Sequence, residues 1–175
     1  MNNEFRLYCF VNFYLSSIQQ GIQSAHVTHS MFVKYPIEAG CDLEGRLGSS
    51  ILWDWAKNDK TMIVLNGGAG PGIYSIYDTL QTLQVEYEGE KLPYECFNED
   101  ESLDGMMTSV GVVVPKCFYD ARLIKNEHSA LYGEDVYVYD IKEEDEDTHI
   151  VRTVYHPETP EYKFISILKS CRLAQ

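Results

Sequence analysis

Two amides and an imidazole recur at helical spacing near the start of the chain. Gln19, Gln23 and His26, with Ser30 beyond them, lie three or four residues apart, so a helix presents them as one polar stripe. The imidazole titrates near neutral pH, whereas the amides form hydrogen bonds without carrying charge. This spacing predicts a ligand-facing stripe with His26 as a candidate general base. The alternatives are a solvated polar face and a packed histidine bonded to backbone.

A glycine-rich turn is the second candidate site. Asn66-Gly67-Gly68-Ala69-Gly70-Pro71-Gly72 joins an expected strand at 61–65 to an expected helix at 73–84. The backbone N–H groups of such a turn can bind an anion, which makes Asn66, Gly67 and Gly68 candidate ligand-binding residues. The turn matches neither the dinucleotide-binding nor the P-loop pattern. The alternative is a tight turn that requires glycine for steric reasons.

A carboxylate and a hydroxyl stand four residues apart, at Asp104 and Thr108. They are candidate polar groups of a site; the alternative is a loop carboxylate followed by an ordinary strand threonine. His149 and His156 have no partners at metal-binding spacing, so we predict no metal site and no cofactor. The scattered cysteines form no Cys-x-x-Cys pair, which favours buried thiols over a disulfide framework; they are Cys9, Cys41, Cys96, Cys117 and Cys171.

The elements that must position these residues alternate between strand and helix. We expect strands at 5–13, 61–65, 92–97, 108–115 and 136–140, and helices at 17–34, 48–58, 73–84, 117–125 and 160–173. In the helix 17–34, an apolar stripe of Ile18, Ile22, Ala25, His29 and Phe32 is expected to face the core, which makes His29 a core or boundary residue. The alternation predicts one three-layer α/β sandwich around a mixed sheet of four or five strands.

Length and charge favour a single cytoplasmic domain and count against a nucleic-acid-binding protein. The 175 residues, 45% of them hydrophobic, suit a single α/β domain spanning 1–175. No apolar run approaches the roughly 20 residues that span a bilayer, and the N-terminus lacks the features of a signal peptide, so we expect a cytoplasmic protein. The net charge is −13; residues 1–60 carry 5 Lys and Arg against 6 Asp and Glu. This acidity counts against nucleic-acid binding, unless basic residues of the N-terminal third gather on one face.

Around Gln23 and His26, the sequence resembles the class II (archaeal and eukaryotic type) peptidyl-tRNA hydrolases. These residues match the Q-x-x-H of that family's first helix. Lys60–Leu65 is similar to its second strand, and Asp104–Thr108 has the spacing of its D-A-G-x-T motif. Thr108–Pro115 is similar to its final strand, T-x-L-G-I-G-P, although Thr108 can serve as only one of the two threonines.

The resemblance implies a family core at about 5–115, with an insertion at 36–58 and a C-terminal extension at 116–175. It also implies an ester hydrolase acting on peptidyl-tRNA, whose site contains Gln19, Gln23, His26, Asp104 and Thr108. One departure bears on the chemistry: the family's active-site lysine lies four residues before the glutamine, where this chain has Gln19. A neutral amide cannot supply the charge or the proton exchange of an ammonium group.

Three functions remain open from the sequence. The first is a peptidyl-tRNA hydrolase-like ester hydrolase with reduced or lost activity. The second is a non-catalytic binder of a nucleotide-like small molecule on the same scaffold, for which an acidic surface matters less than for tRNA. The third is a protein-interaction module, suggested by 13 tyrosines and an acidic C-terminal region. A homodimer is compatible with each.

Overall fold

A mixed four-stranded sheet forms the centre of the molecule, as seen in the computed structural model, which describes residues 4–36, 49–99, 104–126, 132–142 and 150–174. The strand order is β2-β1-β6-β5. β1 pairs in parallel with β2, and the β1–β6 and β5–β6 pairs are antiparallel. The predicted mixed sheet in an α/β fold is therefore confirmed. The strands are β1 (Phe5–Val11), β2 (Met62–Asn66), β5 (Tyr94–Glu99) and β6 (Met106–Pro115).

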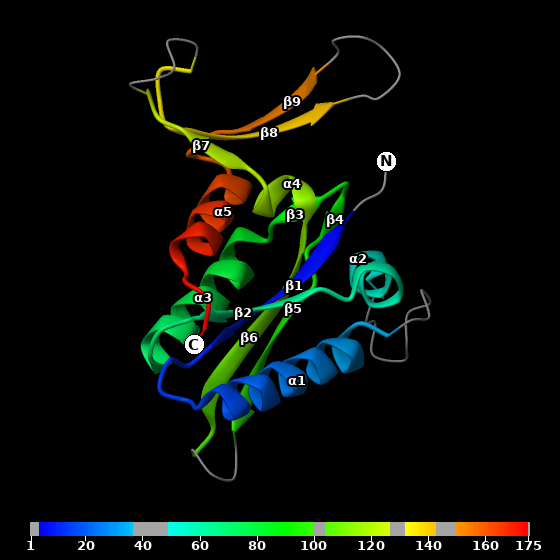
Figure 1. Cartoon of the computed structure of the whole chain (residues 1–175), viewed down its shortest axis with the longest axis vertical. Coiled ribbons are helices and arrows are strands. Elements are labelled where there is room, and N and C mark those ends of the chain that lie inside the picture. Colours follow the sequence, from blue (N-terminus) through cyan, green and yellow to red (C-terminus); the bar gives the residue numbers. More distant parts are fainter. Residues whose placement is uncertain (1–3, 37–48, 100–103, 127–131, 143–149, 175) are drawn as a thin grey trace.

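Helices cover both faces of this sheet (Figure 1). α1 (Ser17–Lys34) lies on one face, where Val27 and Met31 lie close above Gly111 of β6. α3 (Gly70–Leu83) lies on the other face, where Ile73 approaches Phe10 of β1 beside Gly67. Because both faces are covered, β6 is buried along nine consecutive residues, which explains its almost continuous apolar sequence.

The C-terminal third adds a second sheet and further helices. Three antiparallel strands in the order β7-β8-β9 lie at one end of the molecule, with the β8–β9 hairpin extending away from the body (Figure 1). The chain end returns to the central sheet, where Leu173 bridges Leu65 at the edge of β2. The elements are α4 (Lys116–Tyr119), β7 (Arg122–Ile124), β8 (Val136–Lys142), β9 (Ile150–Tyr155) and α5 (Pro160–Ser170).

The expected elements differ from the observed ones in four places. The helix expected at 48–58 is a short α2 (Ser50–Asp54) followed by a π-helix, η1 (Trp55–Asp59). The helix expected at 117–125 divides into α4 and β7, and β9 was not predicted. A small hairpin of β3 (Glu86–Tyr87) and β4 (Glu90–Lys91) contributes Glu90, whose carboxylate accepts hydrogen bonds from the hydroxyls of Ser49 and Ser50 at the start of α2.

The orientation of α1 corrects a sequence-based expectation. Its buried residues are Gln20, Gln23, Ser24, Val27 and Met31, whereas Ile18, Ile22, Ala25 and His29 are exposed. His29 is therefore neither a core nor a boundary residue. The polar face can be buried because its hydroxyls bond within the helix: Ser24 Oγ donates to the Gln20 carbonyl at 2.8 Å, and Thr28 Oγ1 to the Ser24 carbonyl at 2.7 Å.

Candidate functional site

The first turn of α1 is closed by a reciprocal cap that involves Gln19. The backbone N–H of Gln19 donates to the Ser16 hydroxyl at 3.3 Å, and the Gln19 amide oxygen accepts from the Ser16 backbone N–H at 3.0 Å. This capping box satisfies helix N–H groups that otherwise have no partner. Gln19, at the position of the family's lysine, is exposed and holds the helix start. Its role in a site remains a prediction.

Gln23 and Thr108 meet in the buried interface between α1 and β6. The Thr108 hydroxyl donates to Gln23 Oε1 at 2.6 Å, although the two residues are 85 positions apart in the chain. The Ser109 hydroxyl donates to the Gln23 carbonyl at 3.0 Å. Gln23 is 7% exposed, and Thr108 is fully buried. Two residues selected from the sequence as site candidates thus lie in direct contact.

Glu99 completes this network, and the sequence analysis had missed it. Gln23 Nε2 donates to Glu99 Oε2 at 3.1 Å. The strand expected at 92–97 stops short of Asn98 and Glu99, but these residues form the end of β5, beyond a register shift between Phe97 and Asn98. Such an irregularity changes the direction of the following side chains, and no sequence pattern announces it here. The result is a hydroxyl–amide–carboxylate chain running from the core to the α1–β5 surface.

His26 lies beside this network on the surface. Its ring stacks on Phe97 of β5, with 4.5 Å between the ring centroids and 10° between the planes. The residue is exposed and lies one helical turn beyond Gln23. Within the described residues, no hydrogen bond or ion pair joins the imidazole to another side chain. Phe97 therefore holds the ring in place while both ring nitrogens remain able to meet a ligand or water.

Asn12 is a buried polar residue that sequence reasoning also did not select. It is fully buried at the end of β1, and its Nδ2 donates to the Met107 carbonyl at 3.4 Å. Its Oδ1 has no hydrogen-bond partner among the described residues. A buried acceptor without a partner is unfavourable by roughly 1–3 kcal/mol, which makes this atom a candidate contact for water or a ligand donor.

Among the described residues, the Asp104 side chain forms no hydrogen bond with Gln23, Thr108 or Glu99. Asp104 and Gly105 both have positive φ, of 54° and 75°, and form the tight turn that leads into β6. Asp104 is exposed and precedes Thr108 by four residues, which is about 13 Å of extended chain. Its place among the site residues remains a prediction.

The Asn66–Gly72 turn is shaped mainly by packing. A Cβ on Gly67 would lie 2.3 Å from Ile73 Cδ1, and one on Gly72 would lie 2.6 Å from the Gly67 carbonyl oxygen. The N–H of Gly67 already donates to the Val11 carbonyl, and the N–H of Gly68 to Asn66 Oδ1. These N–H groups are therefore committed to internal acceptors, and an anion-binding role for Asn66, Gly67 and Gly68 remains a prediction without support from this geometry.

The charge around the network is neutral to acidic. Among the described residues, no lysine or arginine forms a hydrogen bond or ion pair with Gln19, Gln23, His26 or Thr108. Lys34, at the far end of α1, binds Glu95 at 3.0 Å. The charged group in contact with the network is the Glu99 carboxylate. The described residues also contain no cluster of His, Cys, Asp and Glu suited to a metal ion.

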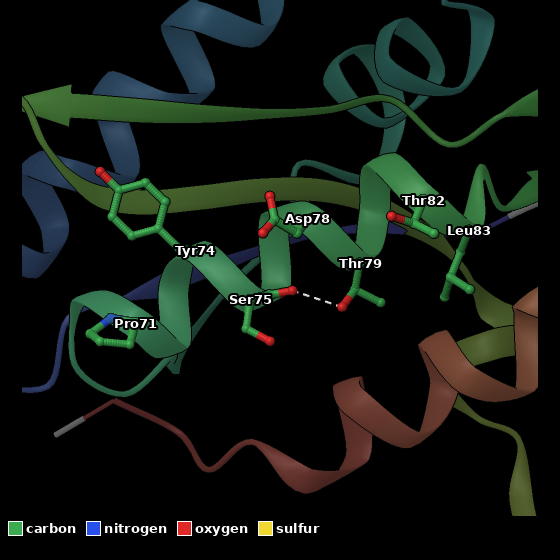
Figure 2. A pocket seen from close by; sticks show the side chains of 7 residues that line it. All are labelled: Pro71, Tyr74, Ser75, Asp78, Thr79, Thr82 and Leu83. Carbon is green, nitrogen blue, oxygen red and sulfur yellow. Dashed lines mark hydrogen bonds between the residues drawn. The ribbon is translucent and has the colours of Figure 1, made fainter.

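A shallow groove of about 500 Å³ runs along the outer face of α3, opposite in the fold to the α1 network (Figure 2). At one end, the Tyr74 hydroxyl accepts from the Met107 backbone N–H at 3.4 Å, next to Thr108 in β6. Its lining carries hydroxyls and one carboxylate but no cation: Pro71, Tyr74, Ser75, Asp78, Thr79, Thr82 and Leu83. The Asp78 carboxylate and the absence of a cation in this lining disfavour an anionic ligand.

No protein-family model matches the chain, and no curated protein is significantly similar to it. The site must therefore be interpreted from its own geometry.

Burial raises the pKa of the Cys9 thiol to about 12, so this thiol is un-ionised at neutral pH. In the part of the chain that the structure describes, no helix is long and apolar enough to cross a membrane.

Proposed function

We propose that this chain is a peptidyl-tRNA hydrolase-like protein whose functional site is the α1–β5–β6 surface around His26 and Glu99. The observation that carries the proposal is the 2.6 Å hydrogen bond between Thr108 and Gln23. The resemblance had selected both residues independently, one from the Q-x-x-H helix and one from the final strand. Their contact is what a shared site requires, and a cytoplasmic location fits such a substrate.

In this proposal, His26 acts as the general base. It takes a proton from a water molecule that attacks the ester carbonyl, and it returns the proton to the leaving 3′-oxygen of the terminal nucleoside. Phe97 fixes the imidazole plane, and the Gln23–Glu99 hydrogen bond fixes the adjacent polar surface. Because Gln19 replaces the lysine, no cation stabilises the developing oxyanion, and hydrolysis is expected to be slow. The Glu99 carboxylate disfavours phosphate contacts close to the ester.

Single-turnover cleavage of a purified peptidyl-tRNA tests this function. The wild type is expected to cleave faster than the uncatalysed rate. His26→Ala is expected to lose about 100-fold or more, the usual contribution of a general base. His156→Ala is the matched control, because His156 follows β9 and pairs with Glu134, outside the proposed site. Gln19→Lys is expected to accelerate the reaction. Absence of cleavage by the wild type, or equal losses in the two histidine variants, would refute the hydrolase.

A second candidate is a non-catalytic binder of a nucleotide-like small molecule. The specific observation in its favour is that the polar groups of the network bond to one another: Gln23 is engaged by Thr108 and Glu99, and Gln19 by the helix cap. Polar groups that already bond to one another keep the shape of a binding surface, but they are not free to activate a substrate. Saturable binding of adenosine, together with no cleavage of peptidyl-tRNA by wild type or Gln19→Lys, would favour this candidate.

A further inference from the structure

Glu99 carries a negative charge that no cation of the described structure balances. Its carboxylate is half-buried at the end of β5, where it accepts a hydrogen bond from the neutral Gln23 amide at 3.1 Å. Among the described residues, no lysine, arginine or histidine forms an ion pair with it. By contrast, Glu95 on the same strand pairs with Lys34 at 3.0 Å. A carboxylate that is partly withdrawn from water and left unpaired attracts a cation.

One oxygen of the Glu99 carboxylate is open to a ligand. Gln23 Nε2 donates to Oε2, and no described residue donates a hydrogen bond to Oε1. Oε1 can therefore accept from a ligand without disturbing Gln23. A metal ion needs several ligands together, and the described residues contain no group of three or more His, Cys, Asp and Glu that could hold one. An ammonium group, with three N–H donors, suits a single carboxylate better.

The carboxylate lies close to the proposed general base. Gln23 contacts Glu99, and His26, one helical turn later, stacks on Phe97 with 4.5 Å between the ring centroids. Phe97 and Glu99 are two residues apart on β5, which is about 7 Å of extended strand. A ligand bound on the α1–β5 surface can therefore contact the imidazole and the carboxylate together.

An aminoacyl ester has its ammonium group at the distance that this spacing requires. The nitrogen is about 2.5 Å from the ester carbonyl carbon, because both are bonded to the same α-carbon. A water molecule held by a general base lies about 3 Å from the base and about 3 Å from the carbonyl carbon that it attacks. An ammonium group bound to Glu99 thus leaves the carbonyl within reach of a water molecule activated by His26.

We propose that the site recognises an aminoacyl ester by its free α-ammonium group, which binds the Glu99 carboxylate. This inference rests on the proposed function, and it narrows the substrate to esters whose amino acid is not acylated on nitrogen. Acylation removes the positive charge and leaves Glu99 without a cationic partner. The ammonium group also brings a positive charge to a site where Gln19 replaces the family's lysine. In the reaction, water adds to the carbonyl and the ester C–O bond breaks, releasing the free amino acid and the 3′-hydroxyl.

Isothermal titration calorimetry of the full chain with two stable compounds tests this recognition. Both are alanyl-adenosines in which an amide replaces the ester; one has a free α-amine, and the other is acetylated on that nitrogen. At about pH 6.5, where the amine is protonated, wild type is expected to bind the free amine at least about tenfold more tightly, the usual effect of a hydrogen bond to a charged group. Glu99→Gln is expected to remove this difference, because its amide keeps an acceptor for Gln23 but carries no charge. Unchanged affinity for the acetylated compound verifies that the variant's site is intact.

Glu158→Gln is the matched control, because it removes the same charge from an exposed position before α5 and is expected to keep the preference. Equal affinity of wild type for the two compounds, or a preference that survives in Glu99→Gln, would overturn the inference but not the location of the site. Absence of binding by either compound would overturn both the inference and the proposed function. Because the measurement is of binding, selective binding by a chain that cleaves no ester would support the ammonium recognition and refute only the hydrolase.

Discussion

Gln23→Leu is expected to lower the free energy of unfolding by about 2 kcal/mol. The substitution leaves the fully buried Thr108 hydroxyl without its 2.6 Å acceptor and removes the donor to Glu99. The Phe97 carbonyl, 3.4 Å from the hydroxyl, offers only a longer replacement. Urea denaturation measures the loss. Gln81→Leu is the matched control, because Gln81 is exposed on α3 and the same change is expected to have an effect below about 0.5 kcal/mol there.

The double variant Gln23→Leu with Thr108→Val tests the cause of that loss. Removing both partners of a buried hydrogen bond is less harmful than removing one, because no polar group is left unsatisfied. The double variant is therefore expected to be more stable than the sum of the single effects by about 1 kcal/mol. Additive effects, or a Gln23→Leu variant as stable as Gln81→Leu, would show that the network contributes little to the fold.

Gly72→Ala is expected to destabilise the protein by about 2 kcal/mol or more. The new Cβ would lie 2.6 Å from the Gly67 carbonyl oxygen, a backbone atom that moves only if the whole turn between β2 and α3 moves. The matched control is Gly21→Ala, the same substitution in α1, where no atom lies within 4 Å and a gain of about 1 kcal/mol is expected. Opposite signs in thermal unfolding would confirm the steric account, and a neutral Gly72→Ala would contradict it.

The sheet and the bounds of α1 were accessible from sequence for clear physical reasons. β1 and β6 are apolar because helices cover them on both faces, and such strands stand out against their neighbours. α1 spans Ser17–Lys34, the bounds that its sequence predicted. By contrast, β9 was missed because the polar Arg152 and Thr153 interrupt its apolar character in an exposed hairpin.

The orientation of α1 could not be predicted from its sequence, because the more apolar face of the helix is the exposed one. The face with Ser24 and Thr28 is buried, since both hydroxyls bond to carbonyls of the same helix, and the face with Ile18 and Ile22 is exposed. A hydrophobicity pattern favours the second face. The choice depends on the room that Gly111 leaves for Val27.

The site was predicted in part. Gln23 and Thr108 came from sequence motifs, and their contact followed from the packing of α1 on β6. Asn12 and Glu99 were not predicted. Asn12 depends on where β1 ends, and Glu99 depends on the register shift in β5. Composition and spacing contain no information on such local irregularities.

The central claim is the location of the functional surface, and amide chemical shifts measured by NMR test it most directly. The ligand is an aminoacyl-adenosine in which an amide replaces the ester, so that it cannot be hydrolysed, with adenosine as the control. The account predicts that the aminoacyl compound shifts the amides of Gln23, His26, Phe97, Glu99 and Thr108 more than adenosine does. Shifts confined to the α3 groove, or none at saturating ligand, would contradict a site between α1 and β5.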